Sequence, residues 1–161
     1  GVATVVCKLF NQVRPDVALF GEKDWQQLAV IRRMARDLDL SLPHADAILG
    51  VPTVREADDL ALSSRNRYLD ETARAQAAAL PAAMRQAIAR IEAGAPVGAA
   101  LRDLEHKLIE GGFTKVDYAA LADAASLERI DLLGNRPARL LIAAHIQGTR
   151  LIDNMAVGAG G

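Results

Sequence analysis

The sequence predicts an α/β unit followed by a small α+β unit, and the order of its apolar patterns is the main reason. In residues 1–52, short continuous apolar runs alternate with segments of helical period, a pattern typical of parallel strands covered by helices. After a polar stretch at 53–69, residues 70–161 hold two helical segments and then a group of strand-like runs, which indicates helices packed on an antiparallel sheet. A chain of 161 residues, of which 51% are apolar, has room for one domain or a small pair.

The first unit, residues 1–52, is expected to fold as helix, strand, helix, strand. Apolar side chains at steps of one, three and four predict a helix over residues 5–13. Strands are expected at 17–20 and 47–51, and such a strand, helix, strand unit is almost always a right-handed parallel crossover. Ligands of these sheets bind at the carboxyl ends of the strands. The helix between the two strands is amphipathic, with an apolar face made of Leu28, Ile31, Ala35 and Leu38.

The stretch at residues 53–69 follows neither period, so a long loop is expected there, and loops of this length are usually functional or disordered. Asp70 is expected to cap a helix that runs to Ala93 with a break near Pro81. A second helix over 99–110 is expected to end at two glycines. Strands are then expected at residues 115–121, 138–147 and 150–155, the last two joined by a tight turn around Gly148.

Composition excludes several classes of function. The 19 basic and 20 acidic residues nearly cancel, so a broad electrostatic footprint for nucleic acid or for an acidic membrane surface is not expected. No uninterrupted apolar run approaches about 18 residues, so no membrane span is expected. Cys7 is the only cysteine and can form no internal disulfide, which favours a cytoplasmic location. His44, His106 and His145 have no metal-ligand partner at a usable spacing, so no metal site is expected on them.

The string FGEKDWQQL, residues 20–28, lies where a strand ends and a helix begins. Unpaired backbone N–H groups and the helix dipole favour a phosphate or carboxylate at such a junction. Lys23 projects from it as a point charge suited to a phosphate, and the alternative is a solvated loop lysine. Asp24 and Gln27 have the spacing of a capping box, although Gln27 could instead offer its amide to a substrate. Gly21 is explained either by a ligand that passes close to the backbone or by a positive φ in the turn.

The string LSSRN, residues 62–66, carries a second group of donors. The hydroxyls of Ser63 and Ser64 and the guanidinium of Arg65 can donate several hydrogen bonds to phosphate oxygens, and a mobile loop can deliver them. The alternative is that the serines form a turn and that Arg65 is a surface charge. The charged residues just before this string are interpreted as a solvated loop face rather than a metal site: Arg55, Glu56, Asp58 and Asp59.

Taken in order, the strings KLFNQVRPD, FGEKDWQQL, GVPTVREAD, LSSRNRYL and LLIAAHIQGTRLIDN resemble the pantothenate synthetase (pantoate–β-alanine ligase) family over essentially the whole chain. The string FGEKD followed by QQL is highly specific to that family. The string SSRN occupies the place of the KMSKS-like loop of the wider class of nucleotidyl-transferring Rossmann enzymes. The resemblance therefore implies the C-terminal part of a Rossmann-like nucleotidyl-transferase domain (1–52), a KMSKS-like phosphate-binding loop (53–69) and a small α+β lid domain (70–161).

The resemblance also implies an activity. Pantoate and β-alanine would be joined to pantothenate with ATP and Mg²⁺, through a pantoyl-adenylate. In this activity, Lys23 would hold the phosphates of ATP, and Ser63, Ser64 and Arg65 would close over them. The ribose would contact Gly21 and Asp24, the adenine would contact the backbone around Val54 and Leu62, and pantoate would contact Gln27. The family forms homodimers through its larger domain.

The chain departs from the family pattern at several places. The HIGH-like motif, the other pantoate donors and the acidic residues that help to hold Mg²⁺ are not in this sequence. Trp25 stands where Phe or Tyr is usual, and Asp59 stands where the loop usually has Gly. Residues 42–45 resemble an insertion that forms a surface bulge.

The printed sequence begins at Gly1 in what reads as the middle of a helix, so we expect a C-terminal segment of a longer enzyme that is inactive alone. Two alternatives remain open. One is a non-catalytic nucleotide-binding or lid module that needs a separate N-terminal half. The other is a structural fragment in which residues 1–50 dock on another chain through an exposed sheet edge.

Overall fold

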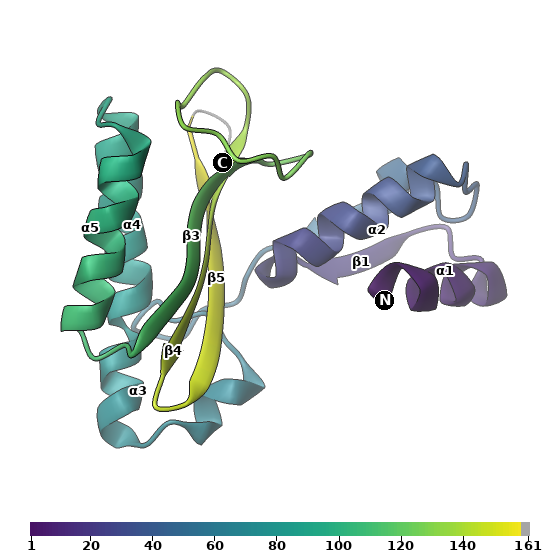
Figure 1. Ribbon diagram of the computed structural model, residues 1–161. Coiled ribbons are helices and arrows are strands. Elements are labelled where there is room, and N and C mark those ends of the chain that lie inside the picture. Colours follow the sequence, from purple (N-terminus) through teal and green to yellow (C-terminus); the bar gives the residue numbers. More distant parts are fainter. Residues whose placement is uncertain (159–161) are drawn as a thin grey trace. The chain divides into compact units, whose positions relative to one another are not determined.

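The computed structural model describes residues 1–158, and the chain divides into two compact units, Gly1–Thr53 and Val54–Gly161 (Figure 1). The first unit is α/β and the second is α+β, so the fold class predicted from the sequence is confirmed. The loop expected at 53–69 belongs almost entirely to the second unit.

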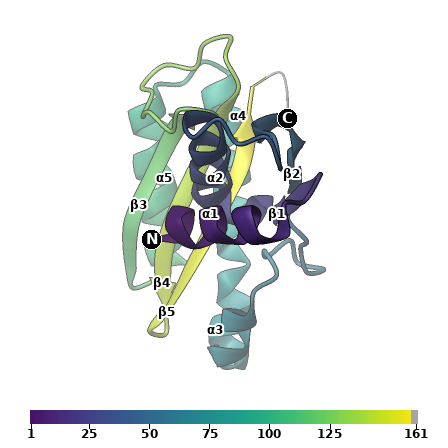
Figure 2. The same cartoon turned by 90° about the vertical axis from the view of Figure 1, so that its right-hand side faces the viewer.

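The first unit contains a two-stranded parallel sheet and two helices. Strand β1 (Ala18–Gly21) pairs in parallel with β2 (Ile48–Val51), so their carboxyl ends lie at one edge. Helices α1 (Val2–Val13) and α2 (Trp25–Asp37) pack against each other, as Figures 1 and 2 show. Two short 3₁₀ turns complete the unit: η1 (Glu22–Asp24) and η2 (Ala45–Ala47).

The core of the first unit lies on one face of its sheet. Phe10 of α1 meets Phe20 of β1 edge to face, with ring centroids 6.2 Å apart. Helix α2 contributes the buried side chains that its spacing predicted, apart from Leu38, which is exposed. The opposite face of the sheet carries Leu19 and Leu49, which are 64% and 45% exposed. Further exposed apolar side chains in this unit are Val2, Val5, Leu9, Val13, Val17, Val30 and Val51.

The second unit packs helices on a three-stranded antiparallel sheet of order β3-β4-β5. Its elements are α3 (Glu71–Ala77), α4 (Ala79–Glu92), α5 (Val97–Glu110), β3 (Lys115–Asp123), β4 (Ala138–Ile146) and β5 (Thr149–Val157). Leu80, Met84, Leu104, Leu140 and Ile142 lie at the centre of its core. Every helix and strand expected beyond residue 69 is present, and β3 and β5 extend further than expected.

The break in the first of these helices is explained by Pro81. It was expected near Pro81 and occurs three residues earlier, at Ala78, which separates α3 from α4. Proline has no N–H for the carbonyl of Ala77, and its ring would clash with that carbonyl in a continuous helix. Pro81 therefore fits the first turn of a new helix, where an N–H is not needed. Asp70 caps α3 as predicted, since its Oδ1 accepts a hydrogen bond of 2.8 Å from the N–H of Ala73.

The tight turn around Gly148 is confirmed. Gln147 and Gly148 both have positive φ, 47° and 71°, which is the two-residue geometry whose twist matches a β-hairpin. The long loop expected at 53–69 is also confirmed, since no strand or α-helix lies among the described residues between β2 and α3, but part of this loop is ordered by hydrogen bonds. Residues 54–62 form a small hairpin with a bridge between Arg55 and Ala61, and residues 64–68 form the 3₁₀ helix η3 (Ser64–Tyr68).

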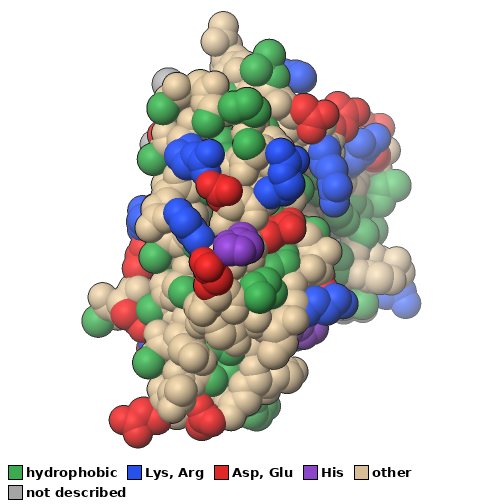
Figure 3. All heavy atoms as spheres, turned by 60° about the vertical axis from the view of Figure 1, so that its left-hand side comes forward, with side chains coloured by type: hydrophobic (Ala, Val, Ile, Leu, Met, Phe, Trp, Pro, Cys, Tyr) green, Lys and Arg blue, Asp and Glu red, His purple; other side chains and the backbone are tan. Residues whose placement is uncertain are grey.

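Among the described residues, no helix is both long enough and apolar enough to cross a bilayer. The face of the second unit that carries α5 shows acidic and basic side chains intermingled around a histidine (Figure 3). Arg90 pairs there with Asp103, and His106 lies 3.4 Å from a carboxylate oxygen of Glu110. Groups of opposite sign therefore adjoin each other at these two places.

Candidate functional site

The first group of candidate residues lies at the carboxyl edge of the parallel sheet. Strand β1 ends at Gly21, η1 carries Lys23 and Asp24, and Gln27 lies in the first turn of α2. The structure therefore brings these four residues together within one short stretch of chain. Gln27 and Asp24 are exposed, whereas the Lys23 side chain is only 21% exposed and its Nζ lies 3.9 Å from Oδ2 of Asp24. A cation beside a helix start is suited to a phosphate or carboxylate.

The capping interpretation of Asp24 is wrong. Asp24 is the residue before α2, but its side chain makes no capping hydrogen bond. The reason is backbone geometry, because a capping residue needs extended φ and ψ to aim its oxygen at the next turn. The 3₁₀ turn η1 instead gives Asp24 φ −100° and ψ 61°. Its carboxylate is therefore not used in holding the helix start.

Gly21 has φ −66° and ψ 133°, so the explanation by a positive φ is also wrong. A Cβ at this position would meet no atom within 4 Å. The open space is compatible with the other explanation, a ligand that passes close to the backbone.

A close approach that the sequence did not predict lies beside this edge. A Cβ on Gly50 of β2 would lie 2.6 Å from Oε1 of Glu22 and 2.9 Å from its Cγ. The Glu22 side chain therefore lies close over the neighbouring strand, and a larger residue at position 50 would require it to move. The signal in the sequence was Gly50 inside an otherwise apolar strand, which marks either a bulge or a close approach.

The second group of candidate residues lies in the hairpin of the second unit. Val54 and Leu62 lie opposite each other, and the N–H of Leu62 donates to the carbonyl of Val54 at 2.9 Å. Their side chains are 64% and 54% exposed. Two opposed residues of an antiparallel pair point to the same face, so the two side chains form a small apolar surface.

Ser63, Ser64 and Arg65 follow directly on this hairpin. Ser63 caps η3, since its Oγ accepts a hydrogen bond of 3.2 Å from the N–H of Arg65. The turn-forming role left open for the serines is thus real for Ser63, whose hydroxyl proton can still be donated. Ser64 and Arg65 are exposed. The candidate residues fall into two groups, one in each unit.

The interpretation of Arg55, Glu56, Asp58 and Asp59 as a solvated loop face is only partly right, because Asp58 is exposed but all four form ion pairs and Arg55 is largely covered. Arg55 forms a bidentate pair with Asp153 of β5, at 2.8 and 2.9 Å, and the Asp153 side chain is only 1% exposed. Arg74 of α3 donates to Glu56 at 2.8 Å and to Asp58 at 2.6 Å. The hydrogen bonds from Arg74 lower the pKa of both carboxyl groups. These partners lie up to 98 residues apart, so local pattern could not show them.

The described residues contain no group of three or more His, Cys, Asp or Glu side chains that could hold a metal ion. The acidic residues of the hairpin are bonded to arginines instead, as with Glu56 and Arg74.

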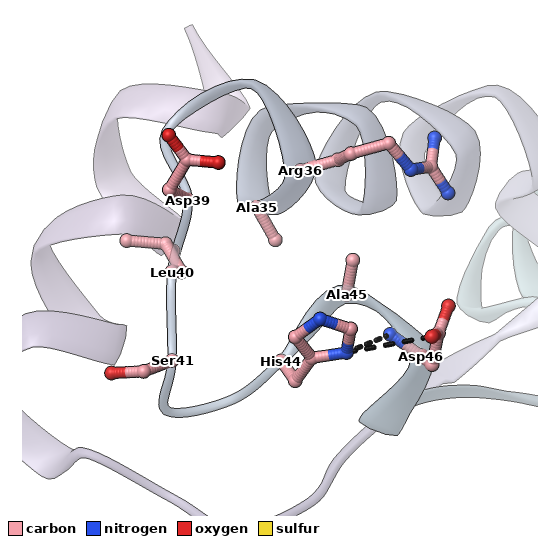
Figure 4. Close-up of a pocket in the computed structure, with 8 residues that line it drawn as sticks. All are labelled: Ala35, Arg36, Asp39, Leu40, Ser41, His44, Ala45 and Asp46. Atoms are coloured by element: carbon pink, nitrogen blue, oxygen red, sulfur yellow. Dashed lines mark hydrogen bonds and ion pairs between the residues drawn. The ribbon is translucent and has the colours of Figure 1, made fainter.

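A hollow of about 320 Å³ lies elsewhere in the first unit (Figure 4). It opens where α2 ends, and α2 is about 20 Å long, so it is distant from Lys23 at the start of that helix. Ala35 and Ala45 face each other across it, and His44 Nδ1 accepts a hydrogen bond of 3.3 Å from the N–H of Asp46. The bulge expected at 42–45 thus forms one rim of this hollow, which contains none of the candidate residues.

Comparison with known sequences gives a consistent result. The profile of the family described as Pantoate-beta-alanine ligase matches residues 1–156. The pantothenate synthetase of Novosphingobium aromaticivorans is 69% identical over 158 residues, which cover 98% of this chain and 55% of that protein. That of Caulobacter vibrioides is 52% identical over 160 residues, again 98% of this chain and 55% of that protein. The chain thus spans about half the length of the curated relatives it matches.

Solved structures agree with the sequence matches. The crystal structure of pantothenate synthetase from Thermus thermophilus aligns with a TM-score of 0.83 and 44% identity, over 96% of this chain and 54% of that one. A pantoate-beta-alanine ligase from Francisella tularensis, complexed with beta-gamma ATP and beta-alanine, aligns with a TM-score of 0.69 and 30% identity. That alignment covers 96% of this chain and 49% of the other.

Proposed function

The chain belongs to the pantoate–β-alanine ligase family, and from this we propose that it serves the ATP-dependent joining of pantoate and β-alanine to pantothenate as the C-terminal part of the enzyme. The observation that carries the proposal is the position of Lys23. It lies at the carboxyl end of a parallel strand and at the start of a helix, in a chain that matches the family profile over residues 1–156.

The proposed reaction has two steps. The pantoate carboxylate attacks the α-phosphorus of ATP, the bond to the β-phosphate breaks, and pyrophosphate leaves. The amine of β-alanine then attacks the acyl carbon of the adenylate, loses a proton and displaces AMP. Negative charge moves onto the leaving phosphates in the first step, so preorganised donors directed at them lower its barrier. Lys23, Ser63, Ser64 and Arg65 are the donors proposed for this role.

The remaining candidates are proposed to bind the nucleoside and pantoate. Gly21 offers open space beside its backbone, and the Asp24 carboxylate is not used in capping, so both are available to the ribose. The backbone around Val54 and Leu62 is proposed to contact the adenine, and the exposed apolar side chains of these two residues lie beside it. Gln27 is exposed at the start of α2 and is proposed to donate its amide to pantoate.

The proposal includes a second polypeptide segment that completes the first unit. Parallel sheets are ordinarily covered on both faces, whereas here Leu19 and Leu49 leave one face exposed. The chain spans only about half the length of each relative, which agrees with a further segment that covers this face. Mg²⁺ ligands, a HIGH-like motif and the homodimer contact are proposed to belong to that other part, in a cytoplasmic enzyme.

The test is release of pyrophosphate and AMP in the presence of ATP, pantoate, β-alanine and Mg²⁺. The full-length protein is expected to release both only when pantoate is present. The 161-residue chain alone is expected to form no measurable pantothenate, and mixing it with the missing half should restore turnover. Turnover by the chain alone close to that of the full-length protein would contradict the division of the site.

A non-catalytic module is the second candidate function, and the uncovered sheet face favours it because such a face implies a partner. Isothermal titration separates the two functions. Binding of ATP by the chain without pyrophosphate release, even with the other half present, would support the module and overturn the ligase.

A further inference from the structure

Asn66 directly follows the proposed phosphate donors Ser63–Arg65, which are called the phosphate segment below, and it is buried, with 8% of its surface exposed. Its side-chain amide Nδ2 donates to Oε1 of Glu56 at 2.7 Å and to the carbonyl of Ala61 at 3.1 Å. Both partners are acceptors, so the amide nitrogen and not the oxygen must face them. Asparagine thus fastens the end of the phosphate segment to the hairpin, and aspartate could not do so.

Glu56 extends this link to a helix. Its second oxygen, Oε2, accepts a hydrogen bond of 2.8 Å from Nη2 of Arg74 in α3. The hydrogen bonds from Arg74 and Asn66 lower the pKa of Glu56, so its carboxylate stays charged at neutral pH. Glu56 therefore acts as a bridge, with one oxygen on the phosphate segment side and the other on α3.

The hairpin itself is fixed to the sheet by a different residue. Arg55 forms its bidentate pair with the buried Asp153 of β5, and its Nη1 also donates to the carbonyl of Asp59 at 2.9 Å. Bidentate guanidinium–carboxylate pairs fix orientation as well as distance. The first arm of the hairpin, which contains Arg55, is thus held against β5.

The buried amide also has a feature that packing alone does not explain. Oδ1 of Asn66 is buried and accepts no hydrogen bond within the described part of the chain. Burial of an unpaired acceptor destabilises a protein, so an apolar residue would be the more stable choice if packing alone mattered. The two donor bonds made by the same amide are the gain that offsets it.

From these contacts we infer that Glu56 and Asn66 are positioning residues, which hold the phosphate segment in a fixed conformation before ATP binds. The inference rests on the proposed function, since it is the phosphates that the segment would contact. Donors that are already aligned need no ordering when charge develops, whereas a mobile segment would lose conformational freedom at that moment. The segment is thus preorganised. The sequence had instead suggested a mobile loop that delivers these donors.

The test uses the full-length enzyme with Glu56→Gln and Asn66→Asp. Asp103→Asn is the matched control, because it removes one carboxylate charge from an exposed ion pair with Arg90 in the same unit. Both positioning variants are expected to lower kcat/KM for ATP by about tenfold or more. They should leave KM for β-alanine within about twofold, because β-alanine reacts only after the adenylate has formed.

Limited trypsin digestion supplies a readout that does not depend on activity. Arg65 and Arg67 are exposed, and cleavage after them requires the segment to leave its conformation. In Glu56→Gln and Asn66→Asp this cleavage should be about tenfold faster than in the wild type, while Asp103→Asn should match the wild type. If Asn66→Asp does not fold, Glu56→Gln alone decides the test.

The two proposals fail in different ways. Wild-type enzyme that releases no pantoate-dependent pyrophosphate would overturn the ligase proposal and, with it, the positioning role. An active wild type, with ATP kinetics and trypsin cleavage unchanged in Glu56→Gln, would overturn the positioning role alone. An equal loss in the ATP and β-alanine parameters would also overturn it, because that result indicates general damage to the fold.

Discussion

The two units of this chain differ in how completely they bury their apolar residues. In the second unit, the helices and all three strands contribute to one core, and Leu104, Leu140 and Ile142 are essentially inaccessible. In the first unit, a much smaller core around Phe10 and Ile31 lies on one face of a two-stranded sheet. The other face remains apolar and exposed.

Both units carry candidate donors, but only the second has a core large enough to support them on its own. The unit with the poorer core carries the candidate lysine and the strand-to-helix junction that suits a phosphate. The unit with the better core carries the second donor group on a hairpin fixed by ion pairs. We therefore expect the first unit to need a partner to fold well, whereas the second should act as a stable support for its loop.

Separate expression of the two units is the strongest way to break this comparison. Residues 54–161 are expected to unfold in one cooperative thermal transition, because they contain a complete core. Residues 1–53 are expected to show no such transition, since a two-stranded sheet with one face exposed is marginal in water. Circular dichroism melting measures both. A sharp transition of residues 1–53 alone would show that the exposed face needs no cover.

Core truncation sharpens the same comparison. Leu104→Ala in the second unit is expected to lower the free energy of unfolding by about 3–4 kcal/mol, since Leu104 is 1% exposed. Ile31→Ala in the first unit should have a smaller effect on the main urea transition, because that transition reports the larger core. Equal shifts of the midpoint would indicate that the two units unfold together.

Lys23→Ala tests the chemical side of the comparison in the full-length enzyme. Loss of a preorganised donor is expected to lower kcat by about 100-fold, roughly 2.7 kcal/mol. Lys8→Ala is the control, because Lys8 is an exposed lysine on α1 of the same unit. Release of AMP measures both variants. A change below about threefold in Lys23→Ala would return this residue to the solvated loop lysine that position alone also allowed.

The sequence predicted elements well where local chemistry decides them. Period, capping by Asp70 and the turn at Gly148 are properties of neighbouring residues, and each was confirmed. The prediction failed where a local rule was overridden by adjacent geometry. Asp24 had capping spacing, but the 3₁₀ turn before it changed its backbone angles.

The candidate site was predictable only in part for a similar reason. Gly21, Lys23 and Gln27 are close in sequence, so their grouping follows from one strand and one turn. The hairpin at 54–62 depends on Asp153, which lies 98 residues from Arg55. Such pairs cannot be seen in a window of local sequence, so the sequence indicated a long loop but not the contacts that order it.

The pH dependence of stability distinguishes the contribution of a surface ion-pair cluster in the second unit from that of its apolar core. Arg150, Lys115 and His145 donate hydrogen bonds to Asp117 and hold the pKa of that carboxyl well below its ordinary value of 3.8. A depressed pKa contributes stability above that value, and the contribution is lost as pH falls below it. Asp117→Asn should therefore lower the urea midpoint at pH 7 and have less effect at pH 3. This account would be contradicted if the shift of the urea midpoint caused by Asp117→Asn were as large at pH 3 as at pH 7. It would also be contradicted if Asp117→Asn caused the same shift in an Arg150→Gln background.

The smallest effect is expected at Asp59, where two contributions oppose each other. Asp59 has φ 73°, a left-handed conformation that glycine adopts without strain, so Asp59→Gly should gain up to about 1 kcal/mol. The same change removes the ion pair in which Arg85 Nε lies 2.6 Å from Oδ2 of Asp59, together with a longer one in which Arg55 Nε lies 3.9 Å from Oδ1. Such pairs contribute about 0–1 kcal/mol each. The two nearly cancel, so urea denaturation should show a net change below about 1 kcal/mol. Arg85→Gln removes the shorter of these ion pairs, and adding Asp59→Gly to it should be stabilising. If the double variant is instead less stable than Arg85→Gln, the left-handed backbone at this turn is not strained.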